Sequence, residues 1–193
     1  MPHAIRIHEQ GGPDVLRWEE VEVGKPAAGE IRVKHGAVGL NYIDVYHRSG
    51  LYPIANFPTS IGLEGAGTVV EVGQAVSDLK VGDRVAYATP PLGAYAQERL
   101  IPADRVVKLP EAISDEQAAA MMLQGMTVQY LIRRTYRVKQ GETVLFHAAA
   151  GGVGLIACQW LKALGVTVIG TGGSPEKAEL AKAHGCTHVI NYR

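Results

Sequence analysis

A glycine-rich turn with the sequence Ala-Ala-Ala-Gly-Gly-Val-Gly, residues 148–154, separates two apolar segments of different periodicity. Residues 143–147 are rich in strand formers, whereas residues 155–162 carry apolar side chains at helical spacing. A strand, a glycine turn and a helix in this order present amide N–H groups and a partial positive charge to a dinucleotide pyrophosphate. Such a turn could also be only a tight connection. The residues that we predict to bind a cofactor here are Ala149, Ala150, Gly151, Gly152, Val153 and Gly154.

The region that distinguishes the two nicotinamide cofactors follows about twenty residues later. NAD-preferring folds place an acid there for the ribose 2′-hydroxyl, but this chain has Thr171 and then glycines. Gly173, Ser174 and Lys177 come next at a predicted helix start, and Tyr192 closes the following strand. A hydroxyl, an ammonium and a helix N-terminus suit a 2′-phosphate, so the pattern favours NADPH. The alternative is that Ser174 only caps a helix and Lys177 is a solvated surface charge.

A second group of polar side chains lies between residues 41 and 53 and contains Asn41, Asp44, Tyr46 and Tyr52. Such a group could line a polar cleft and orient a substrate by hydrogen bonding. The alternative is that the tyrosines pack in a loop with hydrated hydroxyl groups. His47 lies close to Asp44 in the sequence and is more typical of a paired loop residue than of a metal ligand.

A family resemblance rests on the central motif. Gly141-Glu142, Leu145, Ala149 to Gly152, Gly154, Gln159 and Lys162 stand at the spacing of the quinone oxidoreductase/zeta-crystallin signature. The chain resembles that family, which belongs to the medium-chain dehydrogenase/reductase superfamily. Members are typically much longer than 193 residues, so we expect this chain to be an N-terminal portion.

The resemblance implies roles for individual residues. Equivalents of Asn41, Tyr46 and Tyr52 lie beside the nicotinamide and the substrate carbonyl in the family. Thr127 falls where the family approaches the nicotinamide, and Lys177 and Tyr192 fall where it meets the 2′-phosphate. We therefore assign Tyr46 and Tyr52 to orient the substrate and the nicotinamide, with Asn41 and Asp44 supporting them and water supplying the proton.

The same resemblance predicts chemistry without a metal. Zinc-dependent relatives take a cysteine ligand from the region of residues 41–53 and a histidine from a later Gly-His-Glu motif. This chain has no cysteine in that region, and the later motif reads Gly62-Leu63-Glu64. Zinc prefers cysteine and histidine at tetrahedral spacing, and neither set can be assembled here.

The predicted strands and helices around these residues fall into two parts. The predicted fold class is α/β, and the first domain is rich in β-strands. Short strands with Gly and Pro between them fill residues 1–110, which suggests a partly open β-barrel; the resemblance implies one of the chaperonin-10 type. Ser114 to Gln117 form a capping box that starts helix. We predict a catalytic domain over residues 1–123 and a truncated NADPH-binding Rossmann domain over 124–193. The expected strands of the first part are 4–7, 30–34, 67–72, 81–86, 94–101 and 106–109.

Beyond residue 124 the pattern alternates strand and helix, which predicts a parallel sheet with right-handed crossovers. The expected strands are 143–147, 166–171 and 188–191, with helices over roughly 152–164 and 174–184. These are the first half of a doubly wound fold, whose order is 3-2-1-4-5-6. The first strand, normally central, is therefore expected at an edge of the sheet.

Composition limits the function classes. The chain has 193 residues with formal net charge zero and no basic run, which gives no support for nucleic-acid or membrane partners. Two cysteines are too few for a disulfide framework, so the cytoplasm is the expected location. The sequence thus predicts an NADPH-dependent quinone oxidoreductase, homodimeric as a full-length protein. The alternatives are an enone (alkenal/alkenone) double-bond reductase and a catalytically silent cofactor-binding or structural protein.

Overall fold

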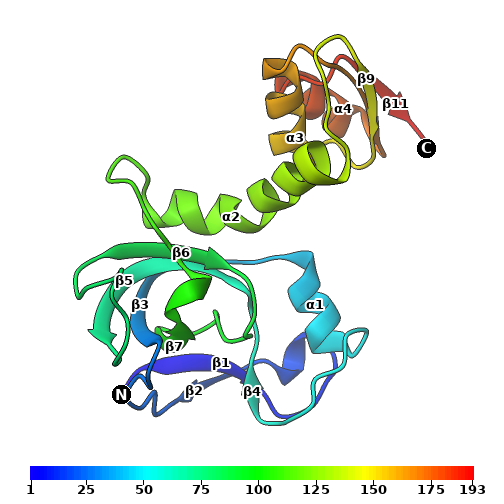
Figure 1. Cartoon of the computed structure of the whole chain (residues 1–193). Helices are drawn as coiled ribbons and strands as arrows, with labels where there is room; N and C mark the ends of the chain where they lie inside the picture. The colour runs from blue at the N-terminus through cyan, green and yellow to red at the C-terminus, as the bar shows by residue number, and fades with distance from the viewer. The chain divides into compact units, whose positions relative to one another are not determined.

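The computed structural model describes all residues, 1–193, and divides into two units, Met1–Leu123 and Gln124–Arg193 (Figure 1). The first unit is built mainly of antiparallel strands, and the second is a small α/β unit. No helix is both long enough and apolar enough to cross a lipid bilayer.

Two antiparallel sheets form the first unit, with strand orders β7-β3-β5-β6-β8 and β2-β1-β4. An isolated bridge between Ala4 and Ala96 joins them without closing a barrel, which confirms the predicted partly open barrel. The strands are β1 (His3–Ile7), β2 (Arg17–Glu20), β3 (Glu30–Gly39), β4 (Thr59–Ser60), β5 (Glu64–Val72), β6 (Arg84–Ala88), β7 (Glu98–Pro102) and β8 (Val107–Lys108), with 3-10 turns η1 (Pro13–Val15) and η2 (Ala103–Arg105).

The core of this unit follows from alternation along the strands. Successive side chains of a strand point to opposite faces, so Ile31 and Val33 of β3 are buried while Lys34 is exposed. Val69 of β5 and Val85 of β6 are fully buried in the same cluster. This apolar layer fixes the register of the sheet, because a slip by one residue would expose it.

Some predicted strands have different bounds. β6 begins at Arg84 rather than at residue 81, since Gly82 has a left-handed φ of 93° and Val81 is 62% exposed in a turn. The strand predicted over 94–101 is regular only from Glu98, because the chain before it makes the bridge at Ala96. β2 and β4 were not predicted.

An unpredicted helix, α1 (Tyr42–Ser49), replaces the loop expected after residue 41. The Asp44 carboxylate accepts a hydrogen bond from the Asn41 amide N–H at 2.9 Å, which caps the first turn. The helix ends at Gly50, whose φ of 91° is left-handed and suits glycine. Asp44 and His47 therefore lie on one helix and not on a loop.

A single helix, α2 (Asp115–Tyr130), runs without a break through the boundary between residues 123 and 124. The predicted capping box is confirmed, because the Ser114 N–H donates to Gln117 Oε1 at 3.0 Å and the Gln117 N–H donates to Ser114 Oγ at 3.2 Å. The π-helical turn η3 (Leu131–Thr135) follows.

The second unit contains a parallel sheet of order β11-β10-β9, with α3 (Gly152–Ala163) and α4 (Pro175–Ala183) as its crossovers. Its strands are β9 (Thr143–Phe146), β10 (Thr167–Gly172) and β11 (His188–Asn191). The predicted half of a Rossmann fold is confirmed, and β9 lies at the edge of the sheet as expected. Leu145 on this strand is 54% exposed.

Candidate functional site

The turn between β9 and α3 has the geometry expected of a phosphate-binding turn. Gly151 is the N-cap of α3, so the amides of Gly152, Val153 and Gly154 form the first helical turn and have no intrahelical acceptor. A Cβ on Gly154 would lie 2.5 Å from the Ala148 carbonyl oxygen, which leaves room only for glycine. Ala149 is fully buried in the core below, so only its backbone remains for a ligand.

The end of β10 holds the turn in place. The Ala149 N–H donates to the Thr171 carbonyl oxygen at 3.1 Å, and the Ala148 N–H donates to Thr171 Oγ1 at 3.2 Å. Thr171 occupies the position where an acid would bind a ribose 2′-hydroxyl, and here its hydroxyl supports the glycine turn instead. The structure gives this residue a structural role that the sequence did not suggest.

Most of the residues predicted to bind the 2′-phosphate follow β10 directly in the chain. Ser174 is the N-cap of α4, and Lys177 lies in the first turn of that helix. A Cβ on Gly173 would lie 3.0 Å from the Tyr192 hydroxyl, so strand β11 brings Tyr192 beside Gly173. Lys177 forms no ion pair in the protein, whereas a hydrogen bond from Ser174 lowers the pKa of the neighbouring Glu176. The Ser174 hydroxyl, the Lys177 ammonium and the N-terminus of α4 suit an anionic group. The Glu176 carboxylate in the same turn would repel such a group.

Thr127, the remaining residue predicted to approach the nicotinamide, lies on α2 and is half-buried. It belongs to the second unit, together with the glycine turn and Lys177.

In the first unit, Tyr46 and Tyr52 lie side by side with ring centroids 5.3 Å apart. Gly50 reverses the chain after α1, and the Tyr52 N–H donates to the Tyr46 carbonyl oxygen at 3.1 Å. Gln10 holds the returning chain with a hydrogen bond from its Nε2 to the Tyr52 carbonyl oxygen at 3.0 Å. Neither tyrosine hydroxyl has a partner within the protein, so both can bind an external carbonyl.

Asn41 and Asp44 belong to a buried network and are only 6% and 3% exposed. The Asn41 side-chain amide donates to Glu64 Oε2 at 2.6 Å. The Tyr95 hydroxyl donates to Asp44 Oδ2 at 2.8 Å. The structure thus brings Asn41 and Asp44 together in one buried network.

Burial controls the ionisation of this network. Desolvation raises the pKa of the Glu64 carboxyl, and hydrogen bonds from Asn41 and the Leu123 amide oppose the shift. Desolvation likewise raises the pKa of Asp44, opposed by the Asn41 amide and the Tyr95 hydroxyl. Burial, together with the neighbouring Asp44, also raises the pKa of Tyr95.

Glu64 and Tyr95 are site residues that the sequence did not single out. Glu64 is fully buried at the start of β5, where its second oxygen accepts the Leu123 N–H at 2.8 Å. In the sequence, Glu64 lies between small and apolar residues of a strand segment, and this was the one available signal. An acid is rarely fully buried unless it is paired. Tyr95 gave no comparable signal.

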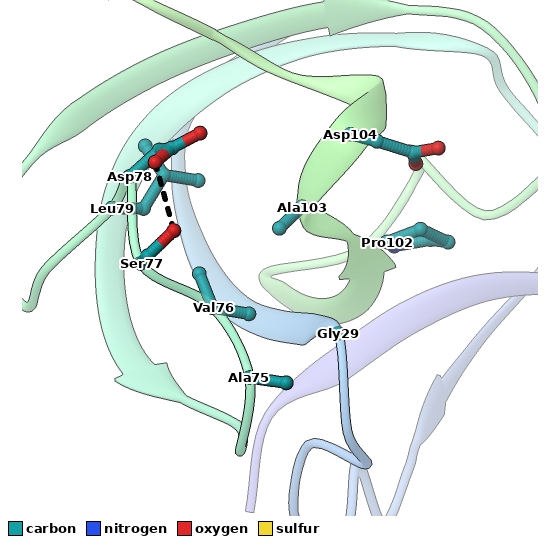
Figure 2. A pocket seen from close by; sticks show the side chains of 9 residues that line it. All are labelled: Gly29, Ala75, Val76, Ser77, Asp78, Leu79, Pro102, Ala103 and Asp104. Atoms are coloured by element: carbon teal, nitrogen blue, oxygen red, sulfur yellow. Dashed lines mark hydrogen bonds between the residues drawn. The ribbon is translucent and has the colours of Figure 1, made fainter.

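The first unit contains several hollows. One, of about 560 Å³, is lined mainly by apolar residues of β1, β2 and β3 and includes Tyr95, whose hydroxyl donates to Asp44. A second, of about 410 Å³, lies among loops, where Ser77 Oγ donates to Asp78 Oδ1 at 2.9 Å and Asp104 lies on the opposite side (Figure 2). No predicted site residue lines the second hollow.

Comparison with known proteins shows what this chain is similar to. Residues 27–111 match the alcohol dehydrogenase GroES-like domain, and residues 152–193 match the zinc-binding dehydrogenase family. The chain is 55% identical over 192 residues to a quinone oxidoreductase of Pseudomonas aeruginosa, covering 100% of this chain and 59% of that protein. It is 49% identical over 197 residues to a 2-haloacrylate reductase of Burkholderia sp, again with 100% and 59% covered.

A solved structure agrees with these relatives. The fold matches Escherichia coli quinone oxidoreductase complexed with NADPH with a TM-score of 0.97 at 53% identity, covering 99% of this chain and 59% of that chain. The chain thus spans about three-fifths of the length of the relatives it matches. Over its whole length this chain is similar to part of the quinone oxidoreductases of Pseudomonas aeruginosa and Escherichia coli.

Proposed function

We propose that the protein containing this chain is an NADPH-dependent quinone oxidoreductase that works without a metal. The observation that carries the proposal is the pair Tyr46 and Tyr52, whose hydroxyls lack partners in a chain that folds like an NADPH-complexed quinone oxidoreductase. NADPH supplies a hydride to the quinone, which becomes a hydroquinone anion and takes a proton from water.

The residues of the second unit bind the cofactor. The first-turn amides of Gly152, Val153 and Gly154 bind the pyrophosphate, with Ala149, Ala150 and Gly151 shaping the turn through their backbone. Gly173, Ser174, Lys177 and Tyr192 bind the 2′-phosphate, and Thr127 contacts the nicotinamide. The Lys177 ammonium lies at the N-terminus of α4 and forms no ion pair, which supports the preference for NADPH over NADH.

The residues of the first unit orient the reactants. Tyr46 and Tyr52 donate hydrogen bonds to the carbonyl groups of the substrate and the nicotinamide, and Asn41 and Asp44 hold this region rigid. A quinone suits such a site because it is already electrophilic and needs no Lewis acid. The full-length protein is proposed to be a cytoplasmic homodimer.

A second candidate function is the reduction of an activated carbon–carbon double bond. The similarity to a 2-haloacrylate reductase favours it, because the same hydride chemistry serves both substrate classes. The test is steady-state oxidation of NADPH by the full-length protein with a panel of quinones, enones and 2-haloacrylate. Turnover of quinones supports the first candidate, turnover of double-bond substrates alone supports the second, and turnover of none supports a catalytically silent protein.

A further inference from the structure

Arg99 of β7 is a buried arginine without a counter-ion. It is only 7% exposed, and no ion pair of the protein includes it. Its Nε donates to the Leu100 carbonyl oxygen at 3.2 Å, and its Nη2 donates to the carbonyl oxygens of Pro91 and Leu92 at 3.0 and 3.3 Å. These neutral acceptors fix the guanidinium in place but do not cancel its charge. A buried charge is usually paired, because an isolated ion is unfavourable in a medium of low dielectric constant.

The remaining nitrogen of the guanidinium, Nη1, also has only a neutral partner. It donates to the Tyr87 hydroxyl oxygen at 3.4 Å. His35 is neutral, because burial lowers its pKa to about 4, and its Nδ1 donates to the Ala96 carbonyl oxygen. His35 Nε2 therefore accepts from the Tyr87 hydroxyl at 2.7 Å, and burial raises the pKa of Tyr87 so that the phenol stays protonated. Nη1 carries a second N–H group, which has no acceptor within the protein.

The guanidinium borders an open hollow of about 220 Å³ in the first unit. Gly93 lines the same hollow, and a Cβ on this residue would lie only 3.6 Å from Arg99 Cζ and 3.8 Å from Nη1. The absence of a side chain at Gly93 therefore leaves this side of the guanidinium uncovered. The apolar side chains around the hollow are Ala4, Val21, Val23, Leu92, Ala96 and Leu100.

Two acids beside the hollow restrict the anion that could enter it. Glu98 is paired with Arg32 at 2.6 Å, whereas Glu22 is exposed and forms no ion pair. Their negative charges oppose an anion of high charge such as phosphate, because like charges repel at short range. The apolar side chains favour a ligand that has a hydrocarbon part. A single carboxylate on a short aliphatic chain satisfies both conditions.

We propose that the hollow beside Arg99 binds a short-chain aliphatic monocarboxylate. The carboxylate accepts a charge-assisted hydrogen bond from Arg99 Nη1, and the aliphatic chain contacts the apolar side chains of the hollow. The bound carboxylate supplies the counter-ion that Arg99 lacks. The site does not depend on the proposed function, because its residues all lie in the first unit and none is a proposed cofactor or substrate ligand.

The probe is sodium butyrate, titrated into the isotope-labelled full-length protein and followed by NMR. We expect saturable shifts of the Arg99 Nε–H and Gly93 amide resonances with a Kd of about 1 mM. Butyramide has the same aliphatic chain but no charge, so its Kd should be about tenfold higher or more. Inorganic phosphate should bind more weakly than butyrate, because Glu22 and Glu98 repel its additional charge.

Two variants separate the role of charge from that of shape. Arg99→Gln should raise the Kd for butyrate about tenfold or more, whereas Arg17→Gln, the same substitution at an exposed position of β2, should leave it unchanged. Glu22→Gln removes a negative charge beside the hollow and should lower the Kd about threefold. Its matched control is Glu9→Gln, at an exposed position that does not line the hollow.

The absence of saturable shifts at about ten times the expected Kd would overturn the proposal, as would equal Kd values for butyrate and butyramide. Tighter binding of phosphate than of butyrate would contradict the assignment to a monocarboxylate. If Arg99→Gln does not fold, Glu22→Gln decides, since an unchanged Kd in this variant would show that butyrate binds elsewhere. Each of these outcomes is the same whether or not the protein reduces quinones, so failure here leaves the proposed function untouched.

Discussion

The Ser174 hydroxyl accepts a hydrogen bond from the Lys177 backbone N–H at 3.3 Å, so the turn that carries the Lys177 ammonium is capped before any ligand binds. Lys177 takes no part in an ion pair, whereas Lys182, on the same helix, pairs with Glu179 at 3.0 Å. One ammonium of α4 is therefore available to an anion, and the other is already engaged.

Under the proposed function, this difference predicts how the protein distinguishes NADPH from NADH. Lys177→Ala should weaken NADPH binding by about 1.5–3 kcal/mol, the net contribution of a hydrogen bond to a charged group. NADH binding should hardly change, since NADH lacks the 2′-phosphate. Titration of both cofactors against the variant provides the measurement, with Lys182→Ala as the control. Equal losses for NADPH and NADH would show that Lys177 does not contact the 2′-phosphate.

The tyrosine pair predicts a separate effect on the substrate. Tyr46→Phe and Tyr52→Phe keep the rings in contact but remove the hydroxyls that lack internal partners. We expect kcat/KM for a quinone to fall about 10–100-fold in each variant, with the Kd for NADPH unchanged within about twofold. Tyr42→Phe is the control, because Tyr42 contacts Tyr46 edge to face from the same helix and is 72% exposed. A kcat/KM unaffected by both substitutions would leave the pair with a packing role only.

Metal removal should leave the activity intact. Residues 152–193 match the zinc-binding dehydrogenases, but position 63 of this chain is a buried leucine and cannot be a ligand. Prolonged dialysis against a strong chelator should preserve quinone reduction, and elemental analysis of the active protein should find no stoichiometric zinc. Activity that is lost on chelation and restored by zinc would contradict a metal-free reaction.

His35 predicts a pH dependence of stability. Burial lowers the pKa of His35 to about 4, opposed by its hydrogen bond to the Ala96 carbonyl oxygen and assisted by Arg99. The unfolded chain, with a histidine pKa near 6.5, binds this proton more readily, so stability is complete above about pH 6.5 and falls as the pH drops towards 4. Urea unfolding at pH 7.5 and 5 should show a loss of about 2 kcal/mol from this group.

The variant His35→Asn isolates the contribution of that side chain. It removes the titrating ring but can keep a donor towards Ala96, so it should lower stability at pH 7.5 and flatten the dependence on pH. If wild type and variant lose the same free energy between the two pH values, His35 is not the group responsible.

Gly154 predicts a packing effect in the second unit. An alanine Cβ there would lie 2.5 Å from the Ala148 carbonyl oxygen, a backbone atom that cannot move without displacing the turn. Gly154→Ala should destabilise this unit by about 1–3 kcal/mol and weaken both NADPH and NADP⁺. Gly151→Ala is the milder comparison, because its Cβ would be 3.2 Å from the same oxygen. Equal midpoints of urea unfolding for the two variants would contradict this account.

The parts of the fold that local periodicity controls were predictable. Residues 143–191 alternate between strand and helix periods, and the observed β9, β10 and β11 agree with the predicted strands to within one or two residues. Ser114 and Gln117 marked the start of α2, since a capping box depends only on neighbours in the sequence.

Other features depend on partners that are distant in the sequence. α1 is an eight-residue helix whose cap uses Asp44, a residue that the sequence had suggested for a cleft. The contact between Asn41 and Glu64 joins positions 23 residues apart, and no local pattern indicates that their side chains meet. Thr171 likewise supports the glycine turn only because β9 and β10 are adjacent. Roles for Tyr46, Tyr52 and Lys177 remain predictions.

Stoichiometry of the reaction tests the central claim most directly. Under anaerobic conditions the full-length protein is mixed with a known amount of NADPH and excess quinone, and both NADPH and hydroquinone are quantified at completion. The account predicts one hydroquinone formed for each NADPH consumed, at a rate well above that of the mixture without protein and above that with NADH. Consumption of NADPH no faster than in the protein-free mixture, with no hydroquinone formed, would contradict it.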